Sequence, residues 1–152
     1  MKIMDFLCPE AISLNFEAQD KKAAITQMVE LLQQCKKIKK SAEAIETVLE
    51  REKLGSTGIG QGVAIPHGKT DSVPDQVGAL AISQKGVEFN SLDGEPVYII
   101  FLLIGPVEVA GQHLKALSRI SRLFKDKFFR QALRDAKTKE EVIKVIEQED
   151  AY

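Results

Sequence analysis

The chain contains few of the residues that build metal and redox sites. Its 152 residues include two cysteines, two histidines and no tryptophan. Cys8 and Cys35 form no CxxC pair, and neither has a metal-ligand spacing to a histidine. The pattern therefore predicts no metal site. The two cysteines are interpreted as reduced thiols of a cytoplasmic protein.

Long apolar segments are also absent. The longest apolar run, Val97–Ile104, suits a buried strand, whereas a membrane helix needs about 20 apolar residues. Residues 1–5 lack the apolar core of a signal peptide. We therefore expect a cytoplasmic protein that is not embedded in a membrane. Any connection to a membrane is expected to run through a partner.

Several motifs with a known chemistry are missing. Segment 58–63 is rich in glycine but departs from GxGxxG, because Val63 occupies the last glycine position. The chain contains no GxxxxGK[ST], no HExxH and no GxSxG. A dinucleotide site, an NTP-binding loop, a zinc peptidase and a serine hydrolase are therefore unsupported.

Neither sign of charge dominates the composition. The 21 basic and 22 acidic residues give a formal charge of −1 and an isoelectric point near 6.2. This balance gives no support for a nucleic-acid partner. The basic cluster at 36–40 is typical of a solvated helix end. The length fits one domain over residues 1–152, which buries roughly 70% of its unfolded surface.

Apolar periodicity predicts that helices and strands alternate along the chain. Helices are expected at 21–35, 41–54, 113–124, 127–136 and 139–147, with Asp20, Ser41, Asp126 and Thr138 as N-caps. Strands are expected at 62–65, 78–83 and 97–104, with a short edge element at 86–89. The strand at 97–104 is expected to be central, because both of its faces are apolar. This order favours a layered α/β domain.

One of the two histidines lies in a setting that suggests phosphate chemistry. His67 stands between Pro66, which restricts the backbone, and Gly68, which frees it. The preceding stretch 54–65 contains four glycines and two hydroxyl residues, and backbone N–H groups in such turns can bind anions. A neutral imidazole is a nucleophile at cell pH. The alternative is a hydrogen-bonded histidine in an ordinary turn.

Four further residues are candidates for contacting a phosphoryl group. His113 lies in the first turn of a predicted helix, on its apolar side. At a helix N-terminus a neutral imidazole can donate a hydrogen bond to an anion. The alternative is a histidine at the edge of the core, with its hydrogen bonds satisfied by the protein. The planar guanidinium group of Arg51 could bind a phosphate group through paired hydrogen bonds, or Arg51 is a solvated helix residue. Ser56 and Thr57 offer hydroxyl and backbone donors to phosphate oxygens, or cap the loop.

These residues lie in segments that resemble one protein family. The segments 51–54, 56–60 and 64–69 together look like the enzyme IIA domain of the fructose/mannitol/nitrogen-regulatory branch of the bacterial phosphotransferase system. Segments 89–97, 99–103 and 113–117 match in the same order. The resemblance covers essentially the whole chain, and the histidine motif is its most specific part.

The resemblance implies a fold, a chemistry and a set of partners. The fold is a mixed, mostly five-stranded sheet flanked by helices. His67 becomes the phospho-acceptor, modified by the phosphocarrier HPr or its nitrogen-branch counterpart, and His113 supports the phosphoryl group. Arg51 faces the charge of the phosphorylated state, while Thr57 and neighbouring backbone N–H groups help to hold the phosphate. No cofactor is implied, and transfer between two protein nucleophiles does not strictly require a metal.

Two outputs of this chemistry remain open, together with a third interpretation. In a fructose- or mannitol-type pathway, a free-standing enzyme IIA passes the phosphoryl group to a cysteine of a separate IIB protein. In the nitrogen-regulatory branch, phosphorylation of His67 controls binding to regulatory partners. In the third interpretation the protein only binds phosphate or a partner. In each of the first two cases we expect a transient docking surface, ringed by apolar residues, around His67.

Overall fold

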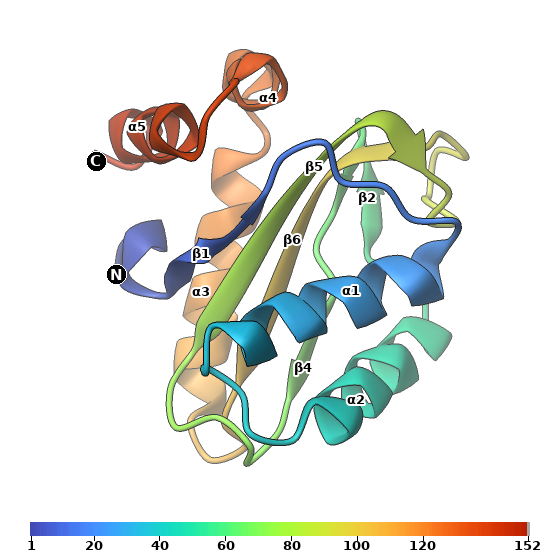
Figure 1. The fold of residues 1–152 in the computed structure, drawn as a ribbon, viewed down its shortest axis with the longest axis vertical. Coiled ribbons are helices and arrows are strands. Elements are labelled where there is room, and N and C mark those ends of the chain that lie inside the picture. Colours follow the sequence, from blue (N-terminus) through green and yellow to red (C-terminus); the bar gives the residue numbers. More distant parts are fainter. Residues whose placement is uncertain (152) are drawn as a thin grey trace.

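The computed structural model describes residues 1–151 and has helices on both faces of a mixed six-stranded sheet (Figure 1). The strands are β1 (Leu7–Ser13), β2 (Gly58–Gly60), β3 (Val63–Ala64), β4 (His67–Lys69), β5 (Val77–Val87) and β6 (Val97–Gly105). A 3-10 turn, η1 (Ile3–Asp5), precedes them. The helices are α1 (Lys21–Gln34), α2 (Ser41–Lys53), α3 (Ala110–Leu123), α4 (Lys127–Asp135) and α5 (Lys139–Glu149).

The sheet is built around β6, as its apolar sequence predicts. The strand order is β1-β5-β6-β3-β2, and β4 pairs with β6 beyond β3. β5 and β6 are antiparallel, whereas β1 runs parallel to β5, and β3 and β4 run parallel to β6. All residues of β6 except one are buried, which is typical of a strand covered on both faces.

Alternate residues of the two long strands fill two separate cores. Ala81 and Ile100 face α1 and α2, and Ile82 and Phe101 face the helices of the C-terminal half. Figure 1 shows α1 and α2 on one side of the sheet and α3 on the other. The expected layered α/β fold is confirmed, and η1 at the N-terminal end packs against α5 at the C-terminal end.

The structure departs from the expected elements at several points. The sheet has six strands. The apolar pattern did not reveal β1, β2 and β4, because they are short or are interrupted by glycine and proline. Residues 86–87 are the end of β5 beyond an irregularity in its pairing with β6, not a separate edge element. Asp20, Asp126 and Thr138 cap helices as expected. Ser41 does not, since α2 begins at Ser41 and Lys40 occupies the cap.

The interruption between β3 and β4 positions one of the candidate residues. Both strands pair with β6, but Ile65 and Pro66 separate them. Proline cannot donate to the ladder, whereas its carbonyl still accepts from the backbone N–H of Leu103 at 3.0 Å. His67 therefore begins β4 directly opposite Leu103, on a strand anchored to the centre of the sheet.

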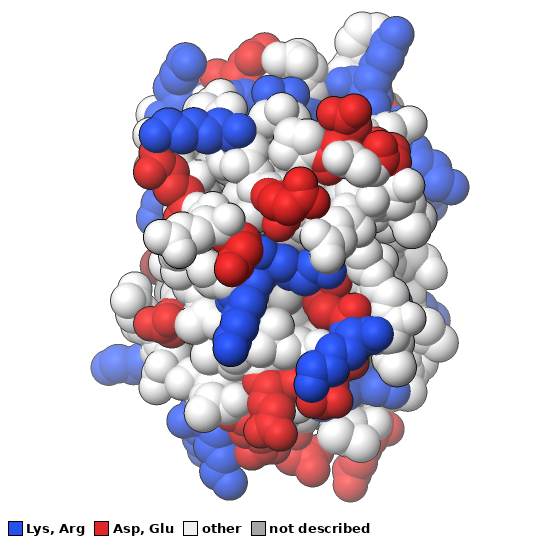
Figure 2. Space-filling model, turned by 90° about the vertical axis from the view of Figure 1, so that its right-hand side faces the viewer, with Lys and Arg blue, Asp and Glu red and all other residues white. Residues whose placement is uncertain are grey.

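The surface and helix lengths agree with the composition. On the face shown in Figure 2, basic and acidic side chains are interspersed. Within residues 1–151, none of the helices combines the length and apolarity needed to cross a membrane.

Candidate active site

The ring of His67 is held with one nitrogen blocked and the other available. Nδ1 lies 2.8 Å from the carbonyl oxygen of Ile65. A carbonyl oxygen only accepts, so Nδ1 must carry the proton and donate it. In the neutral ring, Nε2 then carries the lone pair. The turn at Pro66 thus fixes both the orientation and the tautomer of a half-buried imidazole.

The surroundings favour the neutral, nucleophilic form of this ring. Burial is the main influence, and it lowers the pKa of His67 below its ordinary value. The bond to Ile65 and the charge of Glu52 oppose this shift, while the charge of Arg51 adds to it. An imidazole must be unprotonated at the attacking nitrogen, so this shift keeps the nucleophile available at neutral pH.

His113 is brought beside His67 by α3, the helix that follows β6. It lies one turn into α3, and the two imidazole centroids are 5.8 Å apart, with their planes inclined by 51°. Burial, followed by the charges of His67 and Lys69, lowers the pKa of His113 to about 4. Both rings are therefore neutral near pH 7. The sequence prediction that these two histidines act together is consistent with this contact.

Gln76 contacts His113, although no sequence pattern indicated it. Its side-chain oxygen lies 2.9 Å from Nδ1 of His113, and both groups are buried. Gly105 makes room for this contact, because a Cβ there would lie 2.2 Å from the Gln76 oxygen. Nε2 of His113 is buried and has no hydrogen-bond partner among the described residues. An unpaired buried nitrogen is costly unless a ligand completes it.

Arg51 supplies positive charge from the last turn of α2. Its Nη1 donates to the carbonyl oxygen of Gly55 at 2.9 Å, which ties the side chain to the loop that follows the helix. Its charge reaches the His67 ring, where it lowers the pKa. The guanidinium has five N–H donors, so further donors are available for an anion beside His67.

Ser56 and Thr57 use their hydroxyls within the protein. The Ser56 hydroxyl donates to the carbonyl oxygen of Phe89 at 2.8 Å and accepts from the backbone N–H of Gly58. The hydroxyl and the backbone N–H of Thr57 both donate to the Glu52 carboxylate. These contacts match the loop-capping alternative and hold the loop between Arg51 and His67 in place, and contact with phosphate stays a prediction.

The glycine turn lies between β2 and β3. Gly60 and Gly62 have φ angles of +93° and +79°, and they flank the tight connection between these strands. A Cβ on Gly60 would meet Asp93 and one on Gly62 would meet Tyr98, so the turn packs against the chain around the start of β6. His67 begins β4, which follows β3 along the chain, and anion binding by the turn stays a prediction.

Glu52 is a buried carboxylate that organises this loop. Besides the two bonds from Thr57, it accepts from Nζ of Lys21 at 3.0 Å, and it is 7% exposed. Glu52 was not among the predicted site residues, because an acidic residue in a helix is usually exposed. The sequence feature that could have pointed to Glu52 is its position, directly after Arg51 and five residues before Thr57.

We expect Glu52→Gln to lower the free energy of unfolding by about 1–3 kcal/mol, because Lys21 and Thr57 lose a charged acceptor. Chemical denaturation measures the change. Glu50→Gln is the matched control, since Glu50 pairs with Lys53 at 3.0 Å on the same helix but in solvent. The control is expected to change stability by less than about 0.5 kcal/mol. Equal losses in the two variants would contradict a structural role for Glu52.

The arrangement has the parts that transfer of a phosphoryl group needs. The His67 ring has an oriented lone pair and lies beside a second neutral imidazole, and the guanidinium of Arg51 adds positive charge. Such transfer depends on positioning the nucleophile and on stabilising charge on the equatorial oxygens. Among the described residues, no cluster of metal-ligating groups includes His67 or His113.

Comparison with known proteins identifies relatives of the whole chain. Residues 5–149 match the family described as phosphoenolpyruvate-dependent sugar phosphotransferase system, EIIA 2. The fructose-specific EIIABC component of Bacillus subtilis is 38% identical over 150 residues, which cover 99% of this chain. The same residues cover 24% of that relative, so the chain spans about a quarter of its length.

Solved structures extend the comparison. The crystal structure of nitrogen regulatory protein IIA-Ntr from Neisseria meningitidis has 37% sequence identity and a TM-score of 0.88, covering 95% of this chain and 98% of that one. In the complex of enzyme IIA mannitol with phosphorylated enzyme IIB mannitol from Escherichia coli, the matching chain is 21% identical. Its TM-score is 0.79 over 91% of this chain and 95% of that one, which shows a shared fold. The chain therefore belongs to the EIIA 2 family of the phosphoenolpyruvate-dependent sugar phosphotransferase system.

Proposed function

We propose that this protein is a phosphohistidine carrier, in which Nε2 of His67 accepts a phosphoryl group from phospho-HPr and passes it to a cysteine of a separate IIB protein. The observation that carries this proposal is the state of the His67 ring. The carbonyl of Ile65 occupies Nδ1, so only Nε2 is available as a nucleophile. We further propose that the reaction takes place in the cytoplasm.

The transfer itself is a displacement at phosphorus. The Nε2 lone pair attacks the phosphorus atom in line, and the bond between phosphorus and the donor's nucleophile breaks, with its electron pair leaving on the donor. Nδ1 keeps its proton and continues to donate to Ile65. The second transfer repeats this displacement in the forward direction, with a cysteine thiolate of the partner as the attacking group. The His67 ring then returns to its neutral form.

His113 and Arg51 are proposed to stabilise the oxygens of the phosphoryl group. Nε2 of His113 is buried and lacks a protein partner, and its ring lies beside that of His67. With a proton on this nitrogen it donates to a phosphoryl oxygen while the ring stays neutral. The amide of Gln76 can serve either tautomer at Nδ1 of His113, because a half-turn exchanges its oxygen and nitrogen. Arg51 adds charge-assisted donors.

Ser56 and Thr57 are proposed to act by holding the loop. Their hydroxyls are already bonded to Phe89 and Glu52, so direct contact with phosphate requires those bonds to break. The bonds instead fix the chain between the end of α2 and β2. In this role both residues keep Arg51 at a constant distance from the start of β4.

Exposed apolar side chains support a docking role for the surface around the histidines. Leu114 follows His113 on α3 and is 64% exposed, and Leu54 follows the helix that carries Arg51 and is 84% exposed. Leu92 and Val107 are also exposed large apolar residues. A polar centre with apolar side chains around it suits a partner that binds transiently and brings its own reactive group.

A second output has a specific observation in its favour. One relative that matches almost end to end, with 37% sequence identity and 98% of its chain covered, is named a nitrogen regulatory protein IIA-Ntr. In this alternative His67 is phosphorylated by the nitrogen-branch counterpart of HPr, and the phosphorylation state controls binding to regulatory partners. The chemistry at His67 is the same in both cases, and only the recipient differs.

The test is to incubate the purified protein with phosphoenolpyruvate, enzyme I and HPr, and in parallel with the nitrogen-branch donors, and to measure its intact mass. We expect a gain of one acid-labile phosphoryl group. Adding a fructose- or mannitol-type IIB protein should then discharge the group if the carrier output is correct. A phosphoprotein that forms but survives every IIB protein tested favours the regulatory output, and no gain with either donor contradicts both.

A further inference from the structure

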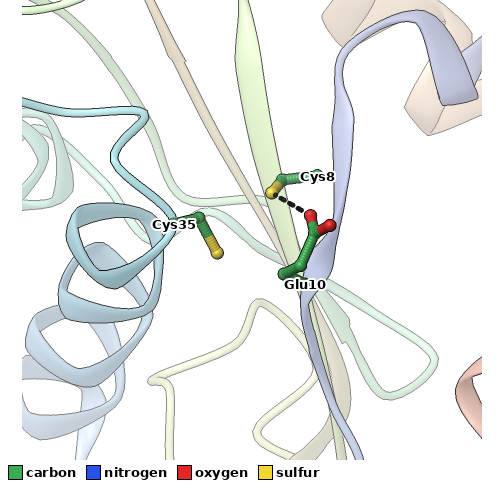
Figure 3. Close-up of side chains that lie close together, drawn as sticks. All are labelled: Cys8, Glu10 and Cys35. Carbon is green, nitrogen blue, oxygen red and sulfur yellow. Dashed lines mark hydrogen bonds between the residues drawn. The ribbon is translucent and has the colours of Figure 1, made fainter.

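A second cluster of reactive side chains, which includes neither histidine, lies between β1 and the end of α1. Figure 3 shows the thiol of Cys35 pointing toward Cys8 and Glu10. Sγ of Cys8 lies 3.2 Å from an Oε atom of Glu10, and the ligand atoms of all three residues lie within 4.8 Å of one another. These are the only two cysteines in the chain. Nothing in the phosphoryl chemistry uses them.

An irregularity of β1 brings two of these side chains together. Cys8 and Glu10 are two residues apart on the strand, a spacing that places both on one face. The pairing of β1 with β5 is irregular between Leu7 and Ile12, and Pro9 lies in this interval. Such bulges re-aim side chains, and they are over-represented beside functional sites. Here the bulge turns a thiol and a carboxylate toward the end of α1.

The end of α1 holds the third side chain in a fixed position. Lys36 adopts a φ of +61°, its N–H donates to the carbonyl of Gln33, and the N–H of Lys37 donates to that of Leu32. This is a Schellman ending, and it places Cys35 at the C-cap. Cys35 is half-buried, so its sulfur is held on the border between the core and solvent.

The spacing of the three ligand atoms suits a tetrahedral metal ion. Zinc bonds of about 2.3 Å to sulfur and about 2.0 Å to oxygen place neighbouring ligand atoms about 3.5–3.8 Å apart. The sulfur of Cys8 and the Glu10 oxygen are 3.2 Å apart, and all three ligand atoms lie within 4.8 Å of one another, so small side-chain movements bring them onto one ion. Two sulfurs and one carboxylate oxygen form a donor set that favours zinc over magnesium or calcium.

We propose that Cys8, Glu10 and Cys35 form a Zn²⁺ site with three protein ligands and a fourth position open to solvent. A pocket of about 700 Å³, lined in part by Cys8, Glu10 and Lys37, gives the ion access and leaves room for a water or another ligand. Binding releases the thiol protons to solvent, because sulfur ligates as thiolate. A Cys8–Cys35 disulfide is the competing use of the cluster, but it leaves the Glu10 carboxylate without a role.

The probe for this proposal is Co²⁺, added to the full chain under a thiol-free reductant. We expect a sulfur-to-cobalt charge-transfer band together with the visible bands of tetrahedral cobalt, saturating at one ion per chain. Zn²⁺ should remove both. Because the chain has two cysteines, any such band must come from Cys8 or Cys35. Cys35→Ser and Glu10→Gln should each weaken binding by at least about tenfold, since loss of an outer-shell partner alone costs that much.

Two controls separate this site from other metal binding. Asp75 lines the same pocket but lies outside the cluster, so Asp75→Asn should leave cobalt affinity unchanged. The double variant His67→Ala/His113→Ala should keep the charge-transfer band, which excludes the histidine pair as its source. Circular dichroism verifies that each variant is folded. The proposal is overturned if reduced protein shows no charge-transfer band at millimolar cobalt, or if both ligand variants bind as well as the wild type.

Discussion

His67→Ala is expected to gain no phosphoryl group under conditions in which the wild type is fully phosphorylated. The variant loses the nitrogen that is proposed to attack. His113 is not expected to replace it, because its Nε2 is buried and is proposed to carry a proton that it donates to the phosphoryl oxygens. Intact mass after incubation with phosphoenolpyruvate, enzyme I and HPr measures the effect. The loss is complete, because no other group in the site is activated as a nucleophile.

The control for this experiment is a neighbouring change that spares the ring. Lys69 is exposed at the end of the same short strand, so Lys69→Ala preserves β4 and His67 while removing a charge near the site. It should still be phosphorylated. A phosphoryl group that appears on His67→Ala would show that another residue is the acceptor, and this result would refute the assignment.

His113→Ala should still be phosphorylated on His67, but about 10²- to 10³-fold more slowly. That is the usual cost of removing one preorganised donor to the charge that develops in a transition state. The ring of His113 lies 5.8 Å from that of His67 and has an unpaired Nε2, so it is placed to donate to the phosphoryl oxygens. Time courses of mass gain at limiting phospho-HPr give the rates.

A conservative variant tests whether this role is a donor role. His113→Gln restores an N–H group, so its rate should lie between those of wild type and His113→Ala. The pKa of His113 is about 4, so its protonation is not expected to change the rate between pH 6 and 8. Equal phosphorylation rates in the wild type and His113→Ala would show that His113 has no role in the transfer. If His113→Ala lost phosphorylation as completely as His67→Ala, His113 would instead be an acceptor.

The site residues that could be predicted lie in short segments with a recognisable sequence pattern. His67 lies in a distinctive Pro-His-Gly turn, and His113 stands on the apolar face of a strongly periodic helix. Gln76 could not be found in this way, because its contact with His113 joins residues 37 positions apart and depends on the bare backbone of Gly105. A contact of this kind is set by tertiary packing and leaves no periodic pattern.

The fold was predictable to a similar extent and for similar reasons. Long elements with a clear apolar period, such as β6 and α3, were located to within a few residues. β1 escaped because Pro9 and Glu10 interrupt its alternation where the bulge lies. The same interruption hid the cysteine cluster, since the 27-residue separation of Cys8 and Cys35 resembles no metal-binding spacing.

The hydroxyl residues show what residue type alone leaves open. Ser56 and Thr57 stand close to His67 in sequence, and the pattern allowed either contact with phosphate or capping of the loop. In the structure both hydroxyls bond protein acceptors, and one of these is the buried carboxylate of Glu52. Sequence proximity indicated the right loop, whereas the direction of each donor depended on partners elsewhere in the fold.

The most direct test of the central claim is to identify the phosphorylated atom. The protein is labelled with ¹⁵N-histidine and phosphorylated through enzyme I and HPr, and long-range ¹H–¹⁵N NMR then assigns both ring nitrogens of each histidine. The account predicts phosphorus on Nε2 of His67, with Nδ1 still protonated and bonded to Ile65. Phosphorus on Nδ1 of His67, or on either nitrogen of His113, would contradict it.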